Sequence, residues 1–224
     1  MKLRTQEDFV DAVSKEISWR KRELTEIKSL VEMSEDEPLR QAAMIRCAVA
    51  LLYAHFEGFI KKVSEAYLNY VGMQRLRNEE LSSCMLAVVM RGQIKAAEAS
   101  NKINAHVQLV EYFRTKALVR ARIPYKNIIQ TESNLSSVVF AEILAVLDIS
   151  PVTYAGKYKL IDSKLLEKRN HIAHGNNLDI DFEEYTELHE QVTELLTLFR
   201  NDIENAVVMR FFAKPTNTVS TLSV

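Results

Sequence analysis

The chain has 224 residues, enough to bury a substantial core, and its content of 47% hydrophobic and 26% charged residues is ordinary for a soluble globular protein. Glycine (5) and proline (4) are scarce, and long periodic segments with few turns favour helices over sheets. The formal net charge of −1 excludes a general polyanion binder, although a local basic groove is compatible with it.

The first part of the chain predicts two long helices. Apolar residues recur on one helical face from 9 to 31, which indicates the first helix. The sequence SEDE, Ser34 to Glu37, has a capping-box pattern, and Pro38 suits the first turn of the helix that follows. We expect this second helix to stop at Gly72. It is apolar nearly all round from Ala42 to Ala54, so it should be the central helix of the fold.

The middle of the chain predicts three shorter helices, over residues 78–99, 103–119 and 133–147, and an irregular segment over 154–160. A run of basic residues overlaps and follows the second of these helices. The run could track RNA phosphates, but a solvated face is the slightly better interpretation. Its members are Arg114, Lys116, Arg120, Arg122 and Lys126.

Two further helices complete the fold. The first begins at about Asp162 and ends at Gly175, and the second is a long helix introduced by a capping-box pattern at Asp181 to Glu184. Residues 213–224 are small and polar and are expected to form a loosely held tail. The sum is an all-α antiparallel helical bundle with extra helices, forming one domain over residues 1–212.

The stretch EKRNHIAHGNN, from Glu167 to Asn177, carries the strongest chemical signal. If the helix from residue 162 is a regular α-helix, its buried arc consists of Leu165, Leu166, Ile172 and Ala173. Arg169 points into that arc, where a lone charge is costly and must be paired or line a cavity. Asn170 and His174 share one edge, within reach of Arg169. This set suits a phosphodiester, because arginine grips phosphate oxygens and histidine moves protons near neutral pH.

The pattern R-N-x-x-x-H, here RNHIAH followed by Gly175, resembles the signature of the HEPN superfamily of all-α domains. Upstream, LLYAHFEGFIKK (Leu51 to Lys62) is similar to the early HEPN helix, and Glu57 matches its acidic position. TESNLSSVVFAEIL (Thr131 to Leu144) is similar to a segment of one stand-alone bacterial branch. The resemblance to the family core covers roughly residues 38–72 and 131–212.

The resemblance implies a metal-independent endoribonuclease that needs no cofactor. Arg169, Asn170 and His174 would be catalytic, with Glu57 in support. Catalytic members act as dimers that bring two motifs together across a cleft, so we expect a homodimer. Many members are toxins neutralised by an antitoxin or effectors of antiviral defence, which implies an RNA substrate and a partner protein. Others have lost catalysis, so the alternative is an interaction module that binds a partner protein or a nucleotide.

Several interpretations stay open at the level of the sequence. Glu57 either pairs with Arg169 or sits at a packing edge. His171 is expected on the solvated side of its helix, and His171 with His174 is a weak metal signal because no third ligand is near. His55 fits a core histidine, whereas His106 and His189 are interpreted as surface positions.

The predicted location is the cytoplasm, with no membrane contact. The N-terminus carries acidic residues and no long apolar run, so it is not a signal peptide. The most apolar stretch, Ala48 to Ile60, is too short to span a bilayer.

Overall fold

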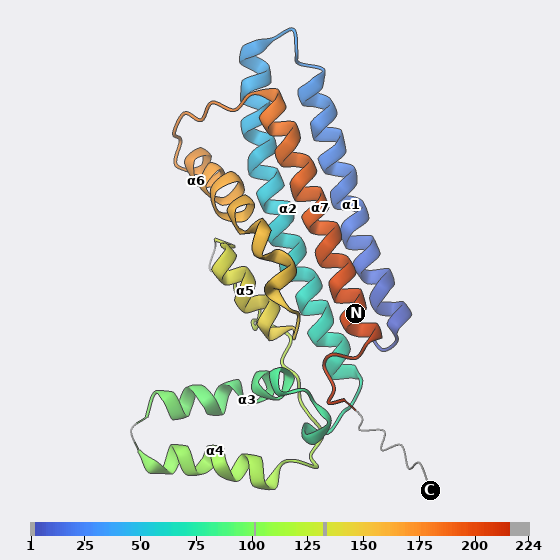
Figure 1. The fold of residues 1–224 in the computed structure, drawn as a ribbon, viewed down its shortest axis with the longest axis vertical. Helices are drawn as coiled ribbons and strands as arrows, with labels where there is room; N and C mark the ends of the chain where they lie inside the picture. Colours follow the sequence, from blue (N-terminus) through green and yellow to red (C-terminus); the bar gives the residue numbers. More distant parts are fainter. Residues whose placement is uncertain (1–2, 101, 132–133, 216–224) are drawn as a thin grey trace, which may run out of the picture.

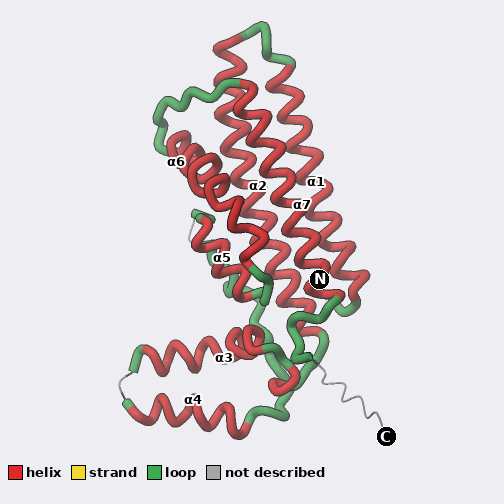
Figure 2. The backbone as a smooth tube through the Cα atoms, viewed as in Figure 1, coloured by secondary structure: helices red, strands yellow, loops and turns green. Residues whose placement is uncertain are grey.

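The computed structural model describes residues 3–100, 102–131 and 134–215. Three long helices, α1 (Gln6–Glu32), α2 (Pro38–Met73) and α7 (Phe182–Val208), lie side by side as an elongated bundle (Figure 1). Helices and loops account for the described residues, which contain two isolated bridges and no extended strand (Figure 2). The predicted all-α architecture is confirmed.

Helix α2 is the central element, as its apolar composition predicted. It packs against both α1 and α7, and aromatic contacts bind the three together; the ring centroids of Phe59 and Phe199, for example, are 6.2 Å apart. By length and composition α2 could also cross a membrane, since an 18-residue window has a mean hydropathy of 1.4. Half of that window is buried in this structure, where α2 serves as the core helix.

The two ends of α2 differ from the prediction. Ser34 does not cap the helix, because its hydroxyl is buried and donates to the Leu30 carbonyl of α1. The N-cap is Glu37, which makes no side-chain capping bond, and Pro38 occupies the first turn as expected. At the other end, Gly72 does not stop the helix. The chain leaves α2 through Arg75, which adopts a left-handed φ of 60°.

A second group of helices covers one side of α2: α5 (Ser137–Val146), η2 (Pro151–Lys157), η3 (Leu160–Leu166) and α6 (Glu167–Ala173). The segment over 154–160 is therefore mostly helical rather than irregular. The η3 segment is a π-helix, so the expected regular α-helix from Asp162 begins only at Glu167. A π-helical stretch turns the following side chains to a different angle, and such stretches are frequent at functional sites.

Helices α3 (Ser83–Glu98) and α4 (Ile103–Thr115) pair as an arm at one end of the bundle (Figure 1). No residue of α4 is fully buried. A short 3-10 turn, η1 (Asn78–Glu80), precedes the arm and binds the segment that follows α7: the Lys214 amide donates to the Glu80 carbonyl at 2.9 Å. The rest of the expected tail, 216–224, lies outside the described residues.

Candidate active site

The π-helix that leads into the motif helix α6 is attached to α5 at its start. Asp162 accepts two hydrogen bonds from Ser137 of α5, from the backbone amide at 2.7 Å and from the hydroxyl at 2.5 Å. One carboxylate therefore fixes the N-terminus of α5 to the segment that leads into α6. Carboxylates are favoured at helix N-termini, where amides have no partner within the helix.

A glycine follows the motif, at a backbone conformation that favours glycine. Gly175 has a φ of 74°, and its amide donates to the Ile172 carbonyl at 3.0 Å. The Asn176 amide donates to the His171 carbonyl, also at 3.0 Å, which completes a Schellman motif. His174 is the C-cap residue and is exposed. Its imidazole is thus presented at the surface by a defined helix end.

Arg169 and Asn170 are linked directly. Arg169 Nη1 donates to Asn170 Oδ1 at 2.8 Å, so the guanidinium does reach the edge that carries the amide. The guanidinium carbon lies 4.0 Å from the centroid of the Tyr53 ring of α2. The predicted buried arc is only partly correct, since Leu165 is buried but Ala173 is exposed. The π-helix explains the difference, because the rotation of 100° per residue does not hold across it.

Asn170 and His174 line one open hollow of about 350 Å³. His171, whose Nδ1 lies 3.3 Å from the Glu167 carbonyl oxygen, is exposed at its rim, as predicted. Amides, imidazoles and carboxylates therefore line the hollow together, and the Arg169 guanidinium donates to the amide oxygen of Asn170. Its residues are Asp162, Leu166, Glu167, Asn170, His171, His174 and Asn176.

Two lysines of this region are neutralised by α7. Lys164 Nζ lies 2.9 Å from Glu187 Oε1, and Lys168 pairs with Glu184. Glu184 therefore contributes only its amide to the predicted capping box, where that amide donates to Asp181 Oδ1 at 2.8 Å. The charges of these two lysines are therefore balanced by carboxylates of α7. Arg169 is then the cation best placed beside Asn170.

Glu57 forms no ion pair with Arg169 within 4.0 Å in the part of the chain that the structure describes. Both charges instead act on the Tyr53 hydroxyl. Burial raises the pKa of Tyr53; the Leu135 amide and Arg169 lower it, and Glu57 raises it further. Glu57 therefore lies near the motif, and its charge and that of Arg169 both affect the pKa of Tyr53.

Sequence reasoning missed two α2 residues that contact the motif. The ring of Tyr53 lies against the guanidinium of Arg169. Arg46 was not singled out; its guanidinium donates to the Asn176 carbonyl at 3.1 Å and to Asn177 Oδ1 at 3.3 Å. Arg46, Tyr53 and Glu57 follow the spacing i, i+7, i+11 of one helical face. That spacing was the available signal, once α2 was known to pack against α6.

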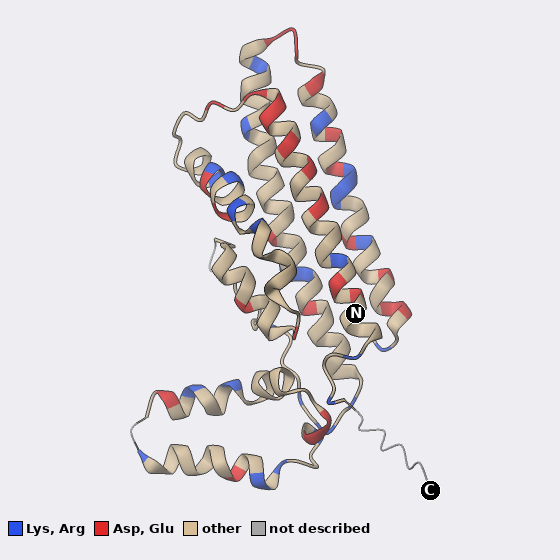
Figure 3. Cartoon of the chain, in the orientation of Figure 1, with Lys and Arg blue, Asp and Glu red and all other residues tan. Residues whose placement is uncertain are grey.

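The basic run does not join the motif within one protomer. Arg114 and Lys116 lie at the end of α4, and Arg120 is bridged to Arg77 beside η1. This region and α6 lie at opposite ends of the molecule, and charges of both signs are distributed along the bundle between them (Figure 3). Within one chain, the basic run and the motif therefore lie on separate parts of the surface.

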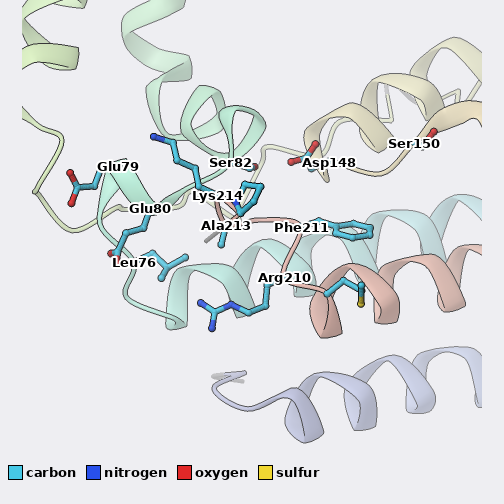
Figure 4. Close-up of a pocket in the computed structure, with 12 residues that line it drawn as sticks. Leu76, Glu79, Glu80, Ser82, Asp148, Ser150, Arg210, Phe211, Ala213 and Lys214 are labelled. Atoms are coloured by element: carbon cyan, nitrogen blue, oxygen red, sulfur yellow. The ribbon is translucent and has the colours of Figure 1, made fainter. Parts of the chain in front are cut away.

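A larger hollow, of about 1040 Å³, lies elsewhere, between η1 and the end of α7 (Figure 4). Its charged side chains have both signs: Glu79, Glu80, Asp148, Arg210 and Lys214. It contains no imidazole, so the smaller hollow is the candidate site. Neither hollow offers a metal centre of the usual kind, since the described residues form no group of three or more His, Cys, Asp or Glu side chains that could hold a metal ion.

A family model described as HEPN_MAE_28990-like HEPN matches residues 9–212. The chain belongs to the HEPN family. Comparisons with curated proteins and with solved structures gave no match. The HEPN match extends beyond the core segments that carried the sequence resemblance, because it includes both α1 and the α3–α4 arm.

Proposed function

We propose that this HEPN protein is an endoribonuclease that cleaves RNA without a metal ion. The observation that carries the proposal is the shared position of Asn170 and His174 on one hollow, with Arg169 hydrogen-bonded to Asn170. A guanidinium, an amide and an imidazole at one place supply a cation for phosphate and a group that moves protons near neutral pH.

The reaction is attack by the ribose 2′-hydroxyl on the adjacent phosphate. His174 accepts the hydroxyl proton as the new P–O2′ bond forms, and the P–O5′ bond breaks. Arg169 stabilises the additional negative charge on the phosphorane, an interaction that is stronger in the transition state than in the ground state. Asn170 holds Arg169 in register. The products are a 2′,3′-cyclic phosphate and a 5′-hydroxyl.

Protonation of the leaving 5′-oxygen calls for a second acid, which we assign to His174 of a second copy in a twofold dimer. A row of exposed, mostly small residues on α2 supports this assembly, because it lies beside the helical face that contacts α6. The row consists of Leu39, Ala43, Cys47 and Ala54. Two motifs facing each other across this surface would provide both the base and the acid.

The direct test compares His174→Ala with His106→Ala on single-stranded RNA. Loss of the acid–base group should reduce cleavage by roughly 10²- to 10⁴-fold. His106→Ala is the matched control, since this histidine is exposed on α4 and does not line the hollow, and it should retain most activity. If the wild-type protein cleaves no cellular RNA, the non-catalytic interaction module becomes the better account.

The proposal extends to a role as a toxin or an antiviral defence effector held in check by a partner protein. Induced expression of the wild-type chain should then arrest growth of a bacterial host. The same induction of His174→Ala should not. Equal growth arrest by both proteins would separate toxicity from RNA cleavage.

A further inference from the structure

We propose that Tyr53 of α2 is a positioning residue for Arg169, which it holds in the orientation that receives the phosphate. The inference rests on the proposed function and adds a residue outside the R-N-x-x-x-H motif. Tyr53 is 2% exposed, and its ring centroid lies 4.0 Å from the guanidinium carbon of Arg169. A cation at this distance is attracted to the face of the ring.

The tyrosine ring is itself fixed at its far end. The Leu135 amide donates to the Tyr53 hydroxyl at 2.6 Å, which ties α2 to the segment before α5. Two residues later, Ser137 binds Asp162, at the start of the turn that leads to Arg169. These contacts connect α2 to the segment before α5, and the start of α5 to the π-helix. Arg169, on the helix that follows, then contacts α2 again through the Tyr53 ring.

This arrangement suits the chemistry asked of an arginine. The guanidinium carbon lies over the tyrosine ring, and the N–H groups of a guanidinium lie in its own plane, where they can reach acceptors at the edge. One of these donors already binds Asn170. A ring fixed by both packing and a hydrogen bond limits rotation of the guanidinium, and a preorganised donor needs no rearrangement when charge develops on the phosphate.

Phenylalanine and leucine at position 53 separate the two parts of this role. Tyr53→Phe keeps the ring and loses the bond to Leu135, so kcat should fall by about 2- to 10-fold, as for one hydrogen bond. Tyr53→Leu also loses the ring, and kcat should fall on the order of 10²-fold, as for a misplaced reacting group. KM should change less than kcat, because Arg169 acts mainly on the transition state.

Tyr154→Leu is the matched control. Tyr154 is equally buried, and its hydroxyl donates to Asp202 at 2.8 Å, but it does not contact Arg169. The control should lower the melting temperature as Tyr53→Leu does while leaving kcat per folded molecule unchanged. A comparable loss of kcat in both variants would overturn the inference, since it would reflect packing alone.

Side-chain NMR tests the contact without any need for activity. The Arg169 side-chain protons should show an upfield ring-current shift that persists in Tyr53→Phe, disappears in Tyr53→Leu and persists in Tyr154→Leu. An unchanged Arg169 signal in Tyr53→Leu would contradict the inference. If instead the shift behaves as stated but the wild-type protein cleaves no RNA, the contact holds and the proposed function fails.

Discussion

The motif residues depend on one another and on α2. Arg169 lies against Tyr53 and donates to Asn170, and Asn170 shares a hollow with His174. His174 itself is exposed at a helix end. This difference suits the proposed reaction, because a cation that orients the phosphate benefits from rigid surroundings, whereas a histidine that transfers a proton must reach the substrate.

Arg169→Lys should not preserve function. A lysine supplies a compact point charge but neither the planar fork nor the second donor that a guanidinium offers to Asn170 and phosphate together. We expect kcat to fall roughly 10²-fold or more, as when one donor to a developing oxyanion is removed. Arg200→Lys on α7 is the control. Wild-type cleavage rates in Arg169→Lys would contradict the assigned role.

His189 links stability to pH and was incorrectly predicted at the surface. It is buried, and burial together with the positive charge of Lys28 lowers the pKa of its imidazole. The unfolded chain therefore binds protons that the folded protein excludes as the pH falls below the ordinary value of about 6.5. The free energy of unfolding should decrease from pH 7 toward pH 5, until the folded imidazole is also protonated. Denaturant titrations should show a weaker decrease in His189→Asn, and an unchanged slope would refute the assignment.

At the scale of the element, the helix that carries the motif is defined by its two ends. A π-helix precedes it and a Schellman turn closes it, so its seven α-helical residues have a defined start and a defined end. Arg46 also binds the backbone just beyond the turn. The short α6 does not depend on helix propensity alone, since short helices draw their stability from tertiary contacts.

Gly175→Ala tests the closing turn. An alanine at φ 74° costs about 1–2 kcal/mol, which should lower the melting temperature by several degrees in a chain of this size. Cleavage should fall as well, because His174 immediately precedes the turn. Gly92→Ala is the opposite case: Gly92 lies inside α3 with open space around it, so alanine should be neutral or raise the melting temperature slightly. Equal effects of the two substitutions would argue against a strained turn.

Periodicity predicted the long helices well because α1, α2 and α7 bury continuous apolar faces. It failed where tertiary contacts decide the backbone. Ser34 has a capping pattern, but its hydroxyl is taken by Leu30. Gly72 looked like a stop, yet the turn falls at Arg75. The motif residues were identified from their pattern, whereas their contacts with Tyr53 and Arg46 required knowledge of which α2 face meets α6.

At the scale of the whole molecule, one chain provides an incomplete site for the proposed reaction. It offers one His174, and the basic run extends from the end of α4 to the segment beside the end of α2 rather than lying beside the motif. The described chain has an exposed, mostly small-residue row on α2 next to the site. A second copy on this row would complete the acid–base pair.

Ala54→Arg tests this assembly. Ala54 is exposed on the α2 row, so a charged side chain should be tolerated by the folded monomer but not within a close interface. Light scattering at micromolar concentration should show a dimer for wild type and a monomer for Ala54→Arg, with a parallel loss of cleavage. Ala96→Arg, at an exposed position on α3, should remain dimeric and active. A wild-type monomer that cleaves RNA would contradict the two-copy mechanism.

The most direct test of the central claim is mass spectrometry of the RNA ends produced by the wild-type protein in EDTA. Attack by the 2′-hydroxyl requires a 2′,3′-cyclic phosphate on one fragment and a 5′-hydroxyl on the other, and it requires DNA of the same sequence to remain intact. The account predicts that the wild-type protein forms these ends in the presence of the chelator. It also predicts that His174→Ala does not form them. Fragments that end in a 3′-hydroxyl, or cleavage that disappears with EDTA, would contradict the account.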